Sequence, residues 1–178
     1  LPAIAEAAGR YRALTRDKAR AAATEMPPGG WRVCHTISNL DLGGGQRHLC
    51  YLLKNRAECF RDSHVVCFPA AEEFFAEQIR DAGATIHYLY DGPTNVMRFS
   101  EVAARLYRLM KKIRPHVVNN WMFDFSLCGT LAASFARVPA IVDSAQMSPS
   151  YMDEVWMPPG DKTNRPFTAA LKAAAKIP

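Results

Sequence analysis

The fold is most constrained by a regular alternation of short apolar segments with longer helical ones through the middle of the chain. The short segments are rich in Val and Ile and lack strict polar alternation, as expected for strands buried on both faces. They are residues 32–37, 63–68, 84–89, 116–120 and 139–143. Helix-like segments lie between them, over residues 46–56, 71–82, 101–113 and 125–136, and apolar residues recur at helical spacing in the second and the third. This order predicts an α/β fold, a Rossmann-like parallel sheet with helices on both faces.

The predicted helices have recognisable ends. Ser100 and Asp124 have the side chains that commonly cap a helix start, and they precede the third and fourth helices. Gly83 follows the second helix, where a left-handed glycine commonly ends one.

The chain is predicted to have three parts. Residues 1–25 form a basic amphipathic helix, which either packs as a solvated helix or lies on a membrane surface. Residues 26–30 (M-P-P-G-G) form a linker. Residues 31–178 form the main domain, whose last part is irregular and proline-rich before an alanine-rich helix near residues 167–176.

Composition excludes several classes of protein. Of the 178 residues, 49% are hydrophobic, which excludes a disordered chain. The formal net charge of +5 comes without a nucleic-acid-binding motif, so we expect no nucleic acid partner. Five scattered cysteines and no ligand spacing for zinc predict neither a disulfide framework nor a metal site. The cysteines favour a reducing, cytoplasmic compartment. The basic helix over residues 1–25 adds the inner face of a membrane as an alternative location.

The most informative local feature is the glycine run Gly43–Gly45 between the first strand and the first helix. Glycines let a ligand approach the backbone closely, and a helix start favours an anion such as a diphosphate. The run is not a dinucleotide fingerprint, because His48 stands where the third glycine belongs, and no P-loop lysine follows it. The alternative is a plain tight turn between strand and helix.

Polar side chains near the carboxyl ends of the strands complete the candidate site, because ligands of parallel sheets bind at that edge. We expect these side chains to contact a ligand, for example through hydrogen bonds with sugar hydroxyls, and Asp124 has helix capping as its rival role. Gln46, at the helix start, belongs instead with the glycine run to the loop that is expected to face a phosphate. The candidate contacts are Asn39, Asp41, His48, Asn120, Trp121, Asp124, Ser144 and Gln146.

Three segments resemble a known family. Trp31–Leu49 (W-R-V-C-H-T-I-S-N-L-D-L-G-G-G-Q-R-H-L) resembles the opening of retaining GT-B glycosyltransferases of the glycosyltransferase group 1 (GT4-like) type. Ile113–Trp121 (I-R-P-H-V-V-N-N-W) is similar to the family's R-P-D-hydrophobic-V-H-x-H segment. Arg137–Val142 (R-V-P-A-I-V) is similar to its G-V-P-hydrophobic strand. The segments occur in the family's order and span most of the chain.

The resemblance implies the N-terminal, acceptor-side half of a two-domain enzyme. Such enzymes transfer a sugar from a nucleotide-sugar donor to a glycan or lipid acceptor with retention of configuration, usually without a metal or other cofactor. Gly44 and Gly45 would face the interdomain cleft near the donor phosphates. The implied partners are the donor, the acceptor, a C-terminal donor domain and a peripheral membrane surface.

The sequence also departs from the family. Asn119 and Trp121 stand where the family has two histidines, and His116 replaces its aspartate. Many members of the family carry, near the position of Gln146, a His or Arg that contacts the reacting sugar or phosphate, and this sequence has neither there. The family's E-x7-E segment, which belongs to the donor domain, is not in these residues. We therefore expect a part of a longer enzyme that is inactive alone, and we identify no catalytic residue. The alternative is a non-catalytic α/β binding or regulatory module.

Overall fold

The computed structural model describes residues 27–60, 62–92, 99–121 and 123–144. The predicted helices at residues 1–25 and 167–176, and the candidate contact Gln146, lie outside these residues. Strands and helices alternate along the described chain. Their order is β1 (Val33–Thr36), α2 (Gly44–Lys54), the 3-10 turn η1 (Glu58–Phe60), β2 (Ser63–Cys67), α3 (Ala76–Asp81), β3 (Thr85–Tyr88), α4 (Phe99–Ile113), β4 (Val117–Trp121), α5 (Phe123–Phe135) and β5 (Ala140–Ser144).

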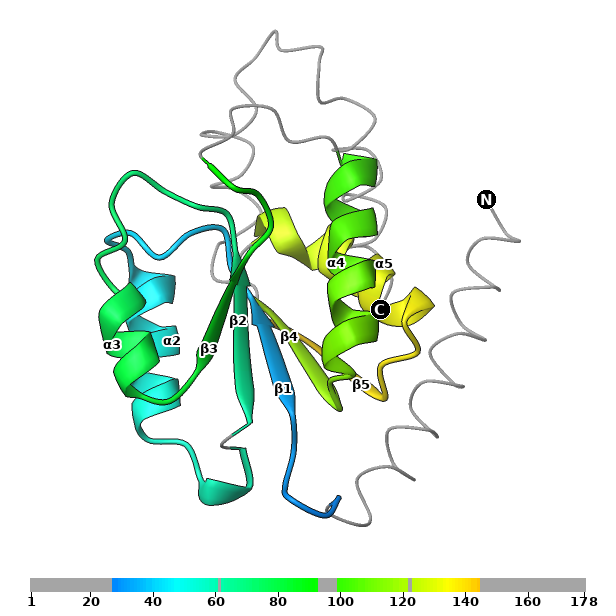
Figure 1. Ribbon diagram of the computed structural model, residues 1–178, viewed down its shortest axis with the longest axis horizontal. Helices are drawn as coiled ribbons and strands as arrows, with labels where there is room; N and C mark the ends of the chain where they lie inside the picture. Colours follow the sequence, from blue (N-terminus) through cyan, green and yellow to red (C-terminus); the bar gives the residue numbers. More distant parts are fainter. Residues whose placement is uncertain (1–26, 61, 93–98, 122, 145–178) are drawn as a thin grey trace, which may run out of the picture. The chain divides into compact units, whose positions relative to one another are not determined.

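The five strands form one sheet in the order β3-β2-β1-β4-β5, and every pair is parallel. Figure 1 shows α2 and α3 on one face of this sheet and α4 and α5 on the other. The predicted Rossmann-like α/β fold is therefore confirmed.

Each face of the sheet has its own apolar core, because successive residues of a strand point to opposite faces. Val65 of β2 packs with Leu49 and Leu53 of α2, whereas the next residue, Val66, packs with Leu106 of α4. All five side chains are at most 1% exposed. Continuous Val-rich strands are the expected consequence of burial on both faces.

The chain reverses its direction of travel across the sheet between β3 and β4. It moves outward from β1 through β2 to β3, and then returns to place β4 on the other side of β1. The β1–β4 pair is therefore a topological switch point, where connections leave toward opposite faces and ligands of such sheets commonly bind.

Several predicted helix ends are wrong by a few residues. The helix α4 begins at Phe99 and α5 at Phe123, so Ser100 and Asp124 lie inside the first turn and do not precede it. The helix α3 begins at Ala76 rather than near residue 71, because the N–H of Phe75 donates to the Leu40 carbonyl at 2.9 Å and holds the preceding segment on the β1–α2 loop. Gly83 ends α3 as predicted, with φ of 77°.

Two arginines take the same left-handed conformation after α4 and α5, which leads to a prediction. Arg114 follows α4 with φ of 53° and Arg137 follows α5 with φ of 60°. Because this region strains residues with a Cβ, Arg114→Gly and Arg137→Gly should each raise the free energy of unfolding by about 0.5–1 kcal/mol. Urea unfolding measures this. Arg108→Gly, at another exposed position but inside α4, should instead lower the free energy of unfolding by about 1 kcal/mol. A lower free energy of unfolding for all three variants would contradict the prediction.

Candidate functional site

The glycine run lies where the β1–α2 connection enters the helix. Gly43 precedes α2 in extended backbone and offers no side-chain cap, while Gly44 and Gly45 are the first helical residues. The run is therefore the helix start itself, and not a separate loop before it. A Cβ on Gly44 would have no neighbour within 4 Å, and the first turn carries no acidic residue. The positive end of the helix dipole is thus left without a neutralising carboxylate of its own turn.

A side chain on Gly43 would displace the amide of Gln46. A Cβ on it would overlap Oε1 of Gln46, which is buried in the first turn. Nε2 of Gln46 donates to Oδ1 of Asn39 at 3.0 Å, and the same oxygen accepts the N–H of Asp41 at 3.3 Å. These bonds fold the loop after β1 against the helix start. Asn39 and Asp41 thus hold the loop's shape, and their predicted contact with a sugar stays a prediction.

The end of β4 carries Asn120 and Trp121 to opposite faces of the sheet. Asn120 is fully buried, where Oδ1 accepts the Thr36 hydroxyl at 2.8 Å and Nδ2 donates to Oγ1 of Thr130 at 3.2 Å. Both polar ends of the amide are therefore paired within the core beside α5. A Cβ on Gly129 would overlap this amide, so α5 approaches β4 closely only because residue 129 is glycine. A ligand contact by Asn120 stays a prediction that requires the packing to open.

Trp121 points to the α2 side. It is 3% exposed, and its ring meets the His48 ring edge-on, with centroids 5.3 Å apart. Its indole N–H donates to Nδ1 of His35 at 3.2 Å. Burial, together with the charge of Arg56, lowers the pKa of His35 to about 4, so this imidazole is neutral at pH 7 and can accept the bond. The structure thus brings His48 and Trp121 together beside the β1–β4 switch point.

The end of β5 forms a separate polar group. The Ser144 hydroxyl donates to Oδ1 of Asn119 at 2.9 Å, and the Ser126 hydroxyl donates to Oδ1 of Asp143 at 2.6 Å. Burial raises the pKa of Asp143, and the bond from Ser126 opposes that rise. Ser144 therefore ties β5 to β4, while its predicted contact with a sugar stays a prediction.

Sequence reasoning missed His35, Thr36, Gly129 and Thr130, which fix the side chains at the switch point. Gly129 offered a signal, because a glycine inside a helical pattern often marks a close approach of backbone. His35 and Thr36 offered none, since their partners Trp121 and Asn120 lie 86 and 84 positions away in the sequence.

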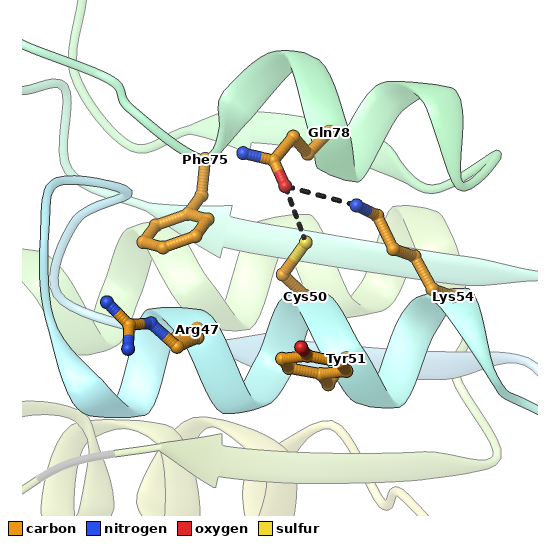
Figure 2. Close-up of a pocket in the computed structure, with 6 residues that line it drawn as sticks. All are labelled: Arg47, Cys50, Tyr51, Lys54, Phe75 and Gln78. Atoms are coloured by element: carbon orange, nitrogen blue, oxygen red, sulfur yellow. Dashed lines mark hydrogen bonds between the residues drawn. The ribbon is translucent and has the colours of Figure 1, made fainter.

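Two further features lie away from the switch point. A groove of about 260 Å³ runs between α2 and α3 (Figure 2). It is lined by Arg47, Cys50, Tyr51, Lys54, Phe75 and Gln78. A second, wider hollow of about 630 Å³ lies along the edge strand β3. Its lining includes Tyr90, whose hydroxyl is buried without a partner in the described part of the chain.

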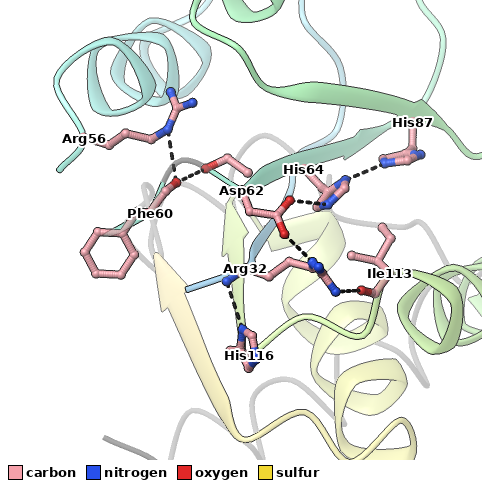
Figure 3. A network of polar contacts seen from close by, with 9 residues as sticks. Arg32, Arg56, Phe60, Asp62, His64, His87, Ile113 and His116 are labelled. Atoms are coloured by element: carbon pink, nitrogen blue, oxygen red, sulfur yellow. Dashed lines mark hydrogen bonds and ion pairs between the residues drawn. The ribbon is translucent and has the colours of Figure 1, made fainter. Parts of the chain in front are cut away.

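A polar network runs from the residues that precede β1 and β2 to the strand β3 (Figure 3). Arg32 bonds Asp62 through Nε and the Ile113 carbonyl, at 2.8 Å, through Nη1. The other carboxylate oxygen of Asp62 lies 3.1 Å from Nε2 of His64, and Nδ1 of His64 lies 2.9 Å from Nε2 of His87. The imidazole pair therefore shares one N–H···N hydrogen bond, which joins β2 to β3.

This pair predicts a pH dependence. Burial lowers the pKa of both His64 and His87; Asp62 opposes the shift at His64, whereas His64 and Lys112 add to it at His87. Protonating both rings would set two donors face to face. Because the folded pKa values lie below the unfolded value of about 6.5, the pair stabilises the fold above that pH and loses this contribution as the pH falls. A histidine-ring NMR titration should show both rings titrating below 6.5, and values at or above it would contradict the arrangement.

The described residues carry few other reactive groups. Within them, no set of three or more His, Cys, Asp or Glu side chains could hold a metal ion. All five cysteines are unpaired thiols, and burial raises the pKa of Cys34 and of Cys67 to about 12. No helix of the described segments has the length and apolarity needed to cross a bilayer.

Comparison with models of known protein families gives no match, and comparison with curated proteins gives no significant match. The resemblance drawn from the three sequence segments therefore stays a prediction.

Proposed function

We propose that this chain is the acceptor-side domain of a retaining glycosyltransferase that uses a nucleotide-sugar donor and a glycan or lipid acceptor. The observation that carries the proposal is the start of α2, where the glycine run, with open space at Gly44, lies beside the switch point of a parallel sheet. The three segments that resemble the family add support. They supply β1, β4 and the first part of β5, which are neighbours in the sheet although the first and last lie about 100 positions apart.

The role that we propose for the glycine run is electrostatic. Backbone N–H groups at the start of α2 would face the donor diphosphate, on which negative charge grows as the sugar leaves. Such groups are fixed in place before the reaction and need no metal. His48 and Trp121 would form the adjoining wall, and Asn39 and Gln46 would hold the loop that positions the glycines.

The proposal includes parts outside these residues. A donor-binding domain would close the cleft over the nucleotide, and the 178 residues alone would not transfer sugar. A peripheral membrane surface is a proposed partner where the acceptor is a lipid. The proposed compartment is the cytoplasm.

The test of this function is sugar transfer by a protein that joins this domain to a donor-binding domain. Gly44→Asp should lower the transfer rate at least about tenfold, because a carboxylate at the helix start repels the diphosphate. Gly92→Asp is the matched control, because a Cβ there also has no neighbour within 4 Å. It should leave the rate unchanged. Equal rates for Gly44→Asp and the wild-type protein would overturn the proposal.

A non-catalytic binding module is the second candidate. It is favoured by Asn119 and Trp121, which stand where the family has histidines; Trp121 is buried and bonded within the domain. Such a module would bind a nucleoside diphosphate or a glycan. It would not transfer sugar, even when joined to a donor-binding domain.

A further inference from the structure

The groove between α2 and α3 carries positive charge that no carboxylate balances. Arg47 and Lys54 line it, and its other lining residues are neutral. In the described part of the chain, Arg47 makes no side-chain hydrogen bond or ion pair, and Lys54 bonds only the neutral amide oxygen of Gln78, at 3.1 Å. Two cations beside a hollow without a counter-ion favour an anionic ligand.

The two charges lie at opposite ends of the groove. Both come from α2, seven positions apart, which separates their Cα atoms by about 10 Å along the helix. Figure 2 shows the guanidinium at one end and the ammonium at the other, with Cys50 and Tyr51 between them. A single small anion would form a close ion pair with only one of these groups, whereas a ligand with an acidic group at each end would form an ion pair with both.

The middle of the groove suits an apolar body with one polar contact. The Phe75 ring is 5% exposed and forms its inner wall, while Tyr51 is 63% exposed beside it. Oε1 of Gln78 accepts from Lys54 and from the Cys50 thiol, the latter at 3.6 Å. Because both partners are donors, the amide oxygen must face them, and Nε2 of Gln78 is left to donate to a ligand.

We propose that this groove is a binding site for a small organic dianion. Its two acidic groups pair with Arg47 and Lys54, its apolar or aromatic body lies over Phe75 beside Tyr51, and Gln78 Nε2 donates a hydrogen bond to it. The site does not depend on the glycosyltransferase proposal, because none of its lining residues belongs to the glycine run.

The probe is terephthalate, a flat ring with a carboxylate at each end, and benzoate is its matched single-acid control. Calorimetry with the 178-residue chain should show saturable terephthalate binding about fivefold tighter than that of benzoate, because benzoate lacks one of the two ion pairs. Amide NMR signals of Cys50, Tyr51 and Gln78 should shift during the titration. Arg47→Gln and Lys54→Gln should each weaken terephthalate about fivefold, as expected for a solvent-exposed ion pair.

A double variant separates this site from general attraction to a basic protein. Arg47→Gln/Lys54→Gln should remove the preference for terephthalate over benzoate. Arg108→Gln/Lys111→Gln, which removes the same charge from exposed positions of α4, should keep it. Equal affinities for the two probes, an equal loss in both double variants, or saturation only by an acidic peptide would overturn the proposal.

Discussion

Gly129→Ala is expected to lower the free energy of unfolding by about 3 kcal/mol, although alanine is the better helix former. The added methyl group would overlap the Asn120 amide, which is fully buried and held by Thr36 and Thr130. Either α5 moves away from β4 or the amide gives up its bonds, and each buried polar group left unpaired costs about 1–3 kcal/mol.

A double-mutant cycle isolates this contact. Asn120→Ala alone should also destabilise, because it leaves the buried Thr36 hydroxyl without its acceptor and the half-buried Thr130 hydroxyl without its donor. In Asn120→Ala/Gly129→Ala the new methyl group occupies the space of the lost amide, so the double variant should be at least about 2 kcal/mol more stable than the sum of the single effects predicts.

Urea unfolding followed by circular dichroism measures each corner of the cycle. Gly92→Ala is the control, because a Cβ there has open space, and it should change stability by less than about 0.5 kcal/mol. Additive effects in the cycle would mean that α5 does not meet β4 through Gly129 and Asn120.

Acidification should remove about 3 kcal/mol of stability through His35 alone. Burial, with the charge of Arg56 as a smaller cause, lowers the pKa of this imidazole to about 4 in the folded protein. Its unfolded value is about 6.5. The contribution of His35 to the free energy of unfolding is complete above pH 6.5 and is lost as the pH falls toward 4. In that range the unfolded chain binds a proton at His35, whereas the folded chain does not.

The neutral ring accepts a hydrogen bond on Nδ1 from the indole N–H of Trp121, so a replacement at this position has to keep an acceptor. His35→Gln keeps an acceptor but cannot titrate. The stability difference between wild type and His35→Gln should therefore shift by about 3 kcal/mol in favour of the variant between pH 7.5 and pH 4. Carboxylates and the other histidines cancel in this difference. If the free energies of unfolding of wild type and His35→Gln changed in parallel with pH, the burial of a neutral His35 would be contradicted.

The fold followed from the sequence because its signals are local. Each strand is a short run that contains Val or Ile, and α2 and α4 bury residues at helical spacing, so the alternation leaves few alternatives to a parallel sheet. The ends of helices were less predictable. The start of α3 depends on a hydrogen bond from Phe75 to Leu40, and a partner 35 positions away leaves no trace in the local pattern.

The candidate site was only partly predictable for the same reason. The glycine run is visible in the sequence, and so is its place after the first strand. Side-chain direction is not visible: Asn120 and Trp121 were expected at a ligand but point into the two cores. One residue of register decides which face each side chain joins. The groove beside α2 was missed because its charges come from a helix face that is ordinarily a solvated surface.

The most direct test of the central claim is a titration of the isotope-labelled chain with uridine diphosphate, followed through its backbone N–H signals. We predict that the largest shifts fall on Gly44, Gly45 and Gln46, that Gly44→Asp abolishes them, and that Gly92→Asp leaves them intact. Shifts centred on Gln78 and the α2–α3 groove, or equal shifts in both variants, would show that the start of α2 does not receive the diphosphate.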